Sequence, residues 1–229
     1  MRPADISVDI WGDFACFTQP DAKIERVSYD VITPSAARGI LCSIYIKPLE
    51  FFYEIVGIEV MKPIKKISIR KNEVRNKAQF VKNDITAIDA SAVRTQRTTI
   101  YLRDVYYRIH ANIHMTNEIL EKKITKNDII KQFNRRIENG KCFRQPSLGL
   151  NECLCYFSPI NNEMTAIQDS KDLGIMLYDV FDIDDNTVLN TNKKERSGHT
   201  NIRYYHPYML NGIISVPAYE SCEIFSVKE

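Results

Sequence analysis

The segment at residues 99–115 constrains the fold of this chain more than any other part of the sequence. Apolar side chains stand at alternate positions from Tyr107 to Met115, and the positions between them are polar and include His110 and His114. Strict alternation over this length is typical of a β-strand with one face against a core. The segment is therefore predicted to be a half-buried strand that shows solvent a polar, hydrogen-bonding face.

The segments around this strand predict a mixed fold. Alternating or β-branched apolar residues predict further strands at residues 5–17, 58–69 and 152–157. Apolar residues at helical spacing predict helices at residues 36–46 and 127–139. Thr33 starts the first helix, Gly140 suits the end of the second, and Pro63 is tolerated at a strand edge or bulge. The order βαββαβ predicts an α+β, ferredoxin-like (RRM-like) domain, an arrangement used by many RNA-binding modules.

The composition changes near residue 158, where the chain turns acidic. Strands are predicted at residues 174–181 and 212–216, with a polar loop at residues 182–201 between them. We therefore expect two domains, a ferredoxin-like domain at residues 1–158 and a small antiparallel β-sheet domain at residues 159–229.

Two basic segments stand out in a chain whose formal net charge is only +2. Residues 61–103 contain eleven Lys and Arg against three Asp and Glu, and residues 122–144 contain eight against two. Concentrated positive charge suits a polyanion such as nucleic acid, although a solvated helix face or loop is the ordinary alternative. Residues 70–96, polar and weakly periodic, are predicted to be a long excursion of the kind that is functional or disordered.

Several classes of function lack their usual sequence signals. The chain has no phosphate-binding loop, no dinucleotide-binding glycine motif, and no histidine or cysteine spacing typical of zinc, so no cofactor and no metal are expected. It also has no apolar run long enough to span a membrane and no signal peptide at Met1, which makes a cytoplasmic location the default. The six cysteines are expected to stay reduced.

Three features are compatible with RNA chemistry and also with ordinary structural roles. His110 and His114 are candidate RNA contacts or acid/base groups, or merely solvated strand residues. Trp11, with the aromatic residues Phe14 and Phe17, can stack on bases or fill a core. The segment at residues 140–149 places two glycines and two cations around an aromatic residue, so its backbone could approach a phosphate, as could any such connector.

Several segments taken together resemble one family, the type I-C CRISPR-associated Cas five subunit, d subtype. The resemblance runs in order through residues 8–18, 25–30, 34–41, 43–48, 70–74, 96–99, 102–105, 133–136 and 145–152. It implies a ferredoxin-like domain with a glycine-rich loop and a small C-terminal sheet domain. It also implies an enzyme that cuts the repeat hairpin of precursor CRISPR RNA without a metal and stays on the 5′ handle of the guide in the Cascade complex.

The resemblance implies an active site made of a tyrosine at the end of the first helix and a Lys-His pair at the second. Tyr45 matches the tyrosine. The pair falls on Lys126-Asn127 or, in the other alignment, on Asp128-Ile129, and neither contains the histidine. A histidine frequent on the third strand of the family is Asn112 here, with His110 and His114 on either side of it.

The leading hypothesis is a metal-independent CRISPR RNA endoribonuclease that leaves a 2′,3′-cyclic phosphate. Its candidate catalytic residues are Tyr45, Lys126 and Asn127. Its candidate RNA-binding residues are Arg38, Arg70, Lys71, Arg75, Arg97, Arg103, Arg135, Arg136, Lys141 and Arg144. Its expected partners are precursor and mature CRISPR RNA and the other Cascade subunits. The alternatives are a non-catalytic subunit that caps the 5′ handle and, more remotely, a general RNA-binding module.

Overall fold

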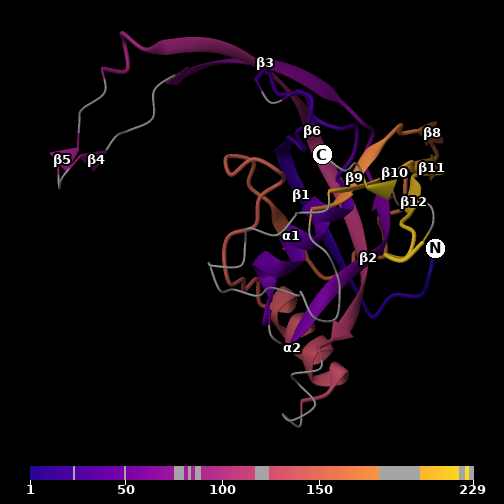
Figure 1. The fold of residues 1–229 in the computed structure, drawn as a ribbon. Coiled ribbons are helices and arrows are strands. Elements are labelled where there is room, and N and C mark those ends of the chain that lie inside the picture. Colours follow the sequence, from indigo (N-terminus) through magenta and orange to yellow (C-terminus); the bar gives the residue numbers. More distant parts are fainter. Residues whose placement is uncertain are drawn as a thin grey trace.

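The computed structural model describes residues 1–22, 24–48, 50–74, 80–81, 84–85, 89–116, 124–180, 202–221 and 225–226 (Figure 1). The helices are α1 (Pro34–Ile44) and α2 (Lys126–Glu138). The strands of the first 158 residues are β1 (Ile6–Ala15), β2 (Phe51–Val60), β3 (Lys66–Val74), β4 (Phe80–Val81), β5 (Asp84–Ile85), β6 (Arg94–Met115) and β7 (Tyr156–Ser158). Those that follow are β8 (Lys171–Asp172), β9 (Met176–Asp179), β10 (Arg203–Tyr205), β11 (Tyr208–Leu210), β12 (Ile213–Ser215) and β13 (Phe225–Ser226).

One large sheet organises the described part of the chain. Its strands follow the order β7-β1-β6-β2-β12-β11-β8, and every neighbouring pair is antiparallel. The predicted alternating strand is β6, which lies between β1 and β2 with Ile109 opposite both Val8 and Ile58. These three side chains are buried, as the alternation predicts for one face of the strand.

The prediction of a single strand at residues 58–69 is wrong, because two separate strands share this range. β2 ends at Val60 and β3 begins at Lys66, and Pro63 lies between them. Proline has no N–H to donate to a ladder and fixes its own φ, so it separates the two strands. Both then pair with the same edge of β6 at different places, Val60 with Tyr107 and Lys66 with Leu102.

The excursion predicted at residues 70–96 is also wrong at both of its ends, where it is regular. β3 and the first half of β6 pair continuously from Lys66↔Leu102 to Val74↔Arg94 and form an arm that leaves the body, with β4 and β5 beyond its end (Figure 1). Ile67 and Ile69 stand at alternate positions of the arm and pack against the core. Arg75 and the polar loop predicted at residues 182–201 lie outside the described residues.

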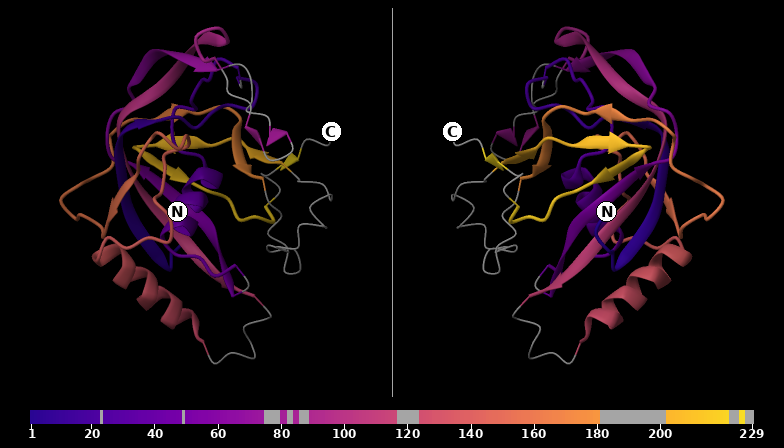
Figure 2. Two further views of the ribbon diagram at one scale, coloured as in Figure 1. Left: turned by 90° about the vertical axis from the view of Figure 1, so that its left-hand side faces the viewer. Right: turned by 90° about the vertical axis from the view of Figure 1, so that its right-hand side faces the viewer.

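Both helices cover the same face of the sheet. The Thr33 side chain caps the start of α1, and Thr125 and Asp128 form a reciprocal capping box on α2. From α2, Phe133 reaches the ring of Tyr53 on β2, with the ring centroids 6.0 Å apart. Figure 2 shows the two helices against the sheet from opposite sides. The other face of the sheet therefore receives the alternate side chains of β1, among them Trp11.

The C-terminal strands divide between two sheets. β12 pairs with β2, with Ile214 opposite Ile58, and so extends the large sheet, while β9, β10 and β13 form a separate three-stranded sheet. The described part of the chain is thus mixed α and β, with mostly antiparallel strands and two helices. The expected boundary at residue 158 stays a prediction. No helix in the described ranges has the length and apolar character needed to cross a membrane.

Candidate active site and RNA-binding surface

Tyr45 occupies the position that ends α1. Its backbone N–H closes the helix on the carbonyl of Leu41, and its ring packs against Phe51 with the centroids 5.4 Å apart. Only 7% of the residue is exposed. The guanidinium carbon of Arg136 lies 4.9 Å from the ring centroid, a cation–π arrangement. The structure therefore brings Tyr45 together with Arg136, which the sequence indicated only as an RNA contact.

Arg136 reaches this position from the last turn of α2. Its Nη1 donates a 3.1 Å hydrogen bond to the carbonyl oxygen of Ile44, the last residue of α1. Its Nε is buried and has no hydrogen-bond partner within the part of the chain that the structure describes. The guanidinium of Arg136 thus extends from α2 and is held at Tyr45 by its hydrogen bond to the backbone of α1.

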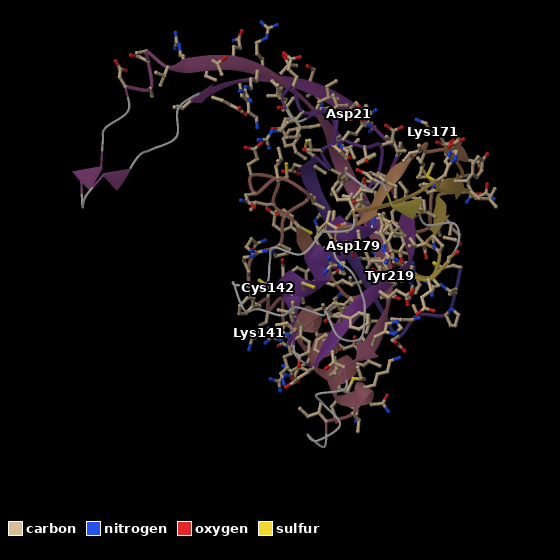
Figure 3. The ribbon with its side chains drawn as sticks, viewed as in Figure 1. Asp21, Lys141, Cys142, Lys171, Asp179 and Tyr219 are labelled. Atoms are coloured by element: carbon tan, nitrogen blue, oxygen red, sulfur yellow. The ribbon has the colours of Figure 1, made fainter. Side chains whose placement is uncertain are left out.

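The loop after α2 closes over the same helix end. The backbone N–H groups of Phe143 and Arg144 both donate to the carbonyl of Ser43, at 2.9 and 3.0 Å. The Phe143 side chain is 75% exposed, and Lys141 and Arg144 are exposed. Figure 3 shows Lys141 and Cys142 on this loop. Two exposed cations and an exposed ring therefore lie on the loop that is bonded to the end of α1, next to Tyr45.

Gly149 fixes the far end of this loop against β1. Its φ is +89°, and a Cβ there would lie 2.0 Å from the carbonyl oxygen of Cys16. The carbonyl of Leu148 accepts a 3.0 Å hydrogen bond from the Cys16 N–H. Glycine is required here both by the left-handed backbone and by the close approach of the two chains.

The structure does not bring Lys126 to Tyr45. Lys126 opens α2, and its Nζ lies 2.5 Å from Oδ2 of Asp5. Ten residues of helix separate it from Arg136, which corresponds to roughly 15 Å at the rise of an α-helix. Asn127 follows Lys126 at the same exposed end of the helix.

His110 and His114 lie on the opposite face of the sheet from Tyr45. His110 is only 8% exposed, and it lies 2.7 Å from Ser7 Oγ and 2.7 Å from Glu59 Oε1. The expectation of a solvated face is therefore wrong at His110, because paired side chains satisfy its ring nitrogens. Neither histidine can replace the one missing at the helices, since the sheet stands between them and Tyr45.

A second polar cluster surrounds Glu54 on this face. Its carboxylate lies 2.7 Å from His114 Nε2 and 2.9 Å from Arg2 Nη2, and His114 stacks on Phe52 at 5.1 Å. Burial alone would raise the pKa of Glu54, but the hydrogen bonds from His114 and Arg2 outweigh it and lower the pKa to about 2.

The candidate RNA-binding cations differ in whether they are paired. Arg38 donates two hydrogen bonds to the carboxylate of Asp179, at 2.6 and 2.8 Å. This buried ion pair links α1 to β9. Figure 3 marks Asp179 in the body of the protein. Lys71 pairs with Glu152 and lies 4.7 Å from the ring centroid of Tyr101. The remaining described candidates with exposed side chains are Arg70, Arg103, Arg135, Lys141 and Arg144, while Arg97 is half-buried and 3.6 Å from Glu73.

The chain matches one protein family over most of its length. The family model for Cas5d, described as CRISPR-associated protein (Cas_Cas5), matches residues 5–217. The chain belongs to the Cas5d family. Two relatives named CRISPR pre-crRNA endoribonuclease Cas5d support this assignment. The one from Mannheimia succiniciproducens is 36% identical and the match covers 96% of this chain and 97% of the relative; the one from Thermus thermophilus is 34% identical and the match covers 99% and 97%.

Solved structures share the fold of this Cas5d chain. The crystal structure of the functionally uncharacterized protein SMU1763c from Streptococcus mutans has a TM-score of 0.63 at 23% identity, with 96% of this chain and 95% of that chain covered. A crystal structure titled CRISPR-associated protein has the same scores and coverage. This level of likeness shows the fold.

Sequence reasoning about this Cas5d chain did not connect two cations, Arg136 and Lys47, with Tyr45. Arg136 carries no motif that separates it from its exposed neighbour Arg135, because only the helix register decides which of them turns inward. Lys47 follows Tyr45 by two residues; its hydrogen bond to Glu50, together with the nearby Tyr45, raises the pKa of Lys47. Its position two residues after the matched tyrosine was the one available signal.

Proposed function

We propose that this chain is a CRISPR RNA endoribonuclease that cuts the repeat hairpin of precursor CRISPR RNA at the 3′ base of the stem, without a metal, and stays on the 5′ handle. The arrangement of Tyr45 beneath the guanidinium of Arg136, next to the exposed cations of residues 141–144, carries this proposal. The names of the two relatives, both pre-crRNA endoribonucleases, support the substrate.

The reaction needs a 2′-hydroxyl held in line with the phosphate and positive charge to offset that of the phosphorane. Tyr45 orients the 2′-hydroxyl, since a phenol is a poor base near neutrality. Arg136 supplies the positive charge that we had expected from Lys126, while Lys47 contributes less because it is paired with Glu50. A slow reaction suffices for an enzyme that keeps its product.

The exposed cations give a path for the RNA backbone away from the scissile phosphate. Arg70 on the arm, Arg103 where β6 leaves the arm, and Arg135, Lys141 and Arg144 near α2 contact the hairpin and handle in this proposal. Arg97 and Lys71 contribute less, because each already lies near a carboxylate. The bound handle in turn places the subunit in Cascade, in the cytoplasm.

The fold proposal that accompanies this function is a ferredoxin-like domain at residues 1–158 and a small antiparallel β domain at residues 159–229. The sheet order β7-β1-β6-β2, with α1 between β1 and β2 and α2 between β6 and β7, supports the first part. The separate sheet of β9, β10 and β13 supports the second.

The test incubates purified protein with a labelled repeat hairpin of its own locus in EDTA. We expect a single cut at the 3′ base of the stem, lost in Tyr45→Phe, which keeps the ring that packs on Phe51. Tyr208→Phe, which removes an exposed hydroxyl on β11, is the matched control and should cut normally. Cutting by both variants would exclude Tyr45, and cutting that requires added Mg²⁺ would contradict the metal-free reaction.

A second candidate is a non-catalytic subunit that caps the 5′ handle. The position of both β6 histidines on the far face of the sheet, and the pairing of Lys126 with Asp5, favour it. Tight binding of the hairpin by the wild-type protein without any cut would establish this role.

A further inference from the structure

Three aromatic rings form a row across three adjacent strands, on the face of the sheet away from the helices. Trp11 of β1 lies opposite Tyr106 of β6 and opposite Tyr156 of β7. The Trp11 ring centroid is 5.6 Å from that of Tyr106, with an interplanar angle of 12°, and 6.1 Å from that of Tyr156, with an angle of 27°. The three rings are therefore nearly parallel and form one aromatic stack, with Tyr156 at its outer end.

The row is separated from the core and open at one end. Ile10, the neighbour of Trp11 on β1, is fully buried, so Trp11 points to the other face of the strand. Tyr156 is 49% exposed, and its strand β7 is the last in the order of the large sheet. An incoming flat ring can therefore reach the row at Tyr156 without any change in the sheet.

Buried polar contacts hold the other end of the row in place. The Tyr106 hydroxyl donates to Oδ2 of Asp9 at 3.2 Å, and Arg108 Nε donates to Oδ1 of the same carboxylate at 2.7 Å. Asp9 is fully buried, and Arg108 offsets its charge. The inner end of the row, at Tyr106, thus needs little ordering when a ligand binds.

The loop at the candidate active site runs to the same edge of the sheet. The side-chain amide of Gln145 donates a 3.0 Å hydrogen bond to the carbonyl of Cys155, the residue before Tyr156. Arg144 immediately precedes Gln145, and its backbone N–H donates to Ser43 at the end of α1. An exposed cation therefore lies on the short path between Tyr45 and the aromatic row.

We propose that the row formed by Tyr156, Trp11 and Tyr106 binds unpaired bases of single-stranded RNA by stacking, entered at Tyr156. Every base has a π-face, so such a surface is tolerant of sequence, and the neighbouring cation suits the phosphate that accompanies the base. This inference rests on the proposed function only for the identity of the ligand as RNA. It gives the RNA a second contact around the β7 edge, apart from the scissile phosphate.

The test uses the fluorescence of Trp11, which is the only tryptophan of the chain. Titration of the wild-type protein with a short oligouridylate, which has bases but no hairpin, should quench the tryptophan in a saturable manner. Inorganic polyphosphate supplies charge without bases and should leave the fluorescence unchanged. Anisotropy of a labelled oligouridylate measures binding independently.

Variants of Tyr156 separate stacking from mere proximity. Tyr156→Leu should weaken oligouridylate binding by about fivefold or more, the loss expected for one stacked base, whereas Tyr156→Phe should bind like the wild type. Tyr208→Leu, on the exposed part of β11, should change nothing. Binding without quenching, equal affinity of Tyr156→Leu and wild type, or no binding at all would each overturn the proposal. Hairpin cutting in EDTA is scored separately, so quenching without cutting rejects the nuclease and keeps this site.

Discussion

Arg136 Nη1 donates to the carbonyl oxygen of Ile44, and so the two helices of the body are joined at their C-terminal ends through one guanidinium. The last carbonyls of a helix have no partner within it and carry a partial negative charge. A cation is stabilised there, and the Tyr45 ring offers it a second favourable surface. Arg136 is thus fixed by contacts that remain when no RNA is bound.

Replacement of Arg136 should damage catalysis more than binding. We expect Arg136→Met to lower the single-turnover cleavage rate by about 100-fold, the usual effect of removing a group that stabilises transition-state charge. Arg136→Lys should recover little, because an ammonium lacks the planar donor geometry. Arg135→Met, one position away and exposed, is the control. Equal cleavage rates for Arg136→Met and Arg135→Met would contradict the assignment.

Arg38 should matter for folding, although its charge first indicated RNA binding. Arg38→Ala leaves the buried Asp179 without its bidentate partner, which should lower the free energy of unfolding by about 3 kcal/mol. Urea denaturation measures this loss. The folded fraction should bind RNA with the affinity of the wild type, and weaker binding at unchanged stability would show that the pairing with Asp179 is not its main role.

Gly149 and Gly140 form a matched pair, since both have positive φ. A Cβ at Gly149 meets the Cys16 carbonyl at 2.0 Å, while a Cβ at Gly140 meets nothing within 4 Å. Gly140→Ala should therefore cost only the conformational strain, about 1 kcal/mol, and Gly149→Ala should cost clearly more. Thermal unfolding of the two variants compares them directly, and equal losses would refute the steric argument.

The carboxylate of Glu54 should make part of the stability depend on acid pH. Its pKa falls from an ordinary 4.5 to about 2 on folding, so its contribution is complete above pH 4.5 and is lost as the pH drops toward 2. The contribution reaches about 3 kcal/mol. We expect the stability gap between the wild type and Glu54→Gln to narrow over this window in urea titrations. A gap that stays constant would mean that Glu54 is not held ionised.

The salt dependence of RNA binding should reveal how many of the exposed cations contact phosphates. Removing one side chain that contacts a phosphate lowers the slope of log affinity against log salt by about one. Arg70→Ala and Arg144→Ala should each show this change, whereas Arg38→Ala should leave the slope as it is. Filter-binding or anisotropy titrations over a range of salt concentrations provide the slopes.

Periodicity predicted much of the fold, and the misses share a physical cause. The alternation of β6 and the caps of α1 and α2 are local properties, so the sequence indicates them directly. The arm was missed because Arg70 and Gln96 are polar, and a two-stranded ladder open to solvent needs no apolar pattern beyond Ile67 and Ile69. Register across strands and helix rotation are tertiary properties.

The candidate site depended on the family resemblance for Tyr45 and on the structure for its surroundings. Charge alone did not distinguish Arg38, which is consumed in a buried ion pair, from Arg70, which is exposed. Likewise, the alternation placed His110 on the polar face but carried no information about Ser7 and Glu59, whose strands are distant in sequence. For Arg38 and His110 alike, the side chains that pair with them come from strands distant in sequence, so local patterns did not indicate the pairing.

β6 spans Arg94 in the arm to Met115 beside β2, about 70 Å at the rise of an extended strand. One backbone joins the arm to the body, and Asp104, with a φ of +54°, lies just past the residue where the β3 ladder ends, so the direction of the arm is set by the local backbone at this junction. The distance between Tyr45 and a molecule bound to the arm is therefore determined by the fold before the molecule binds.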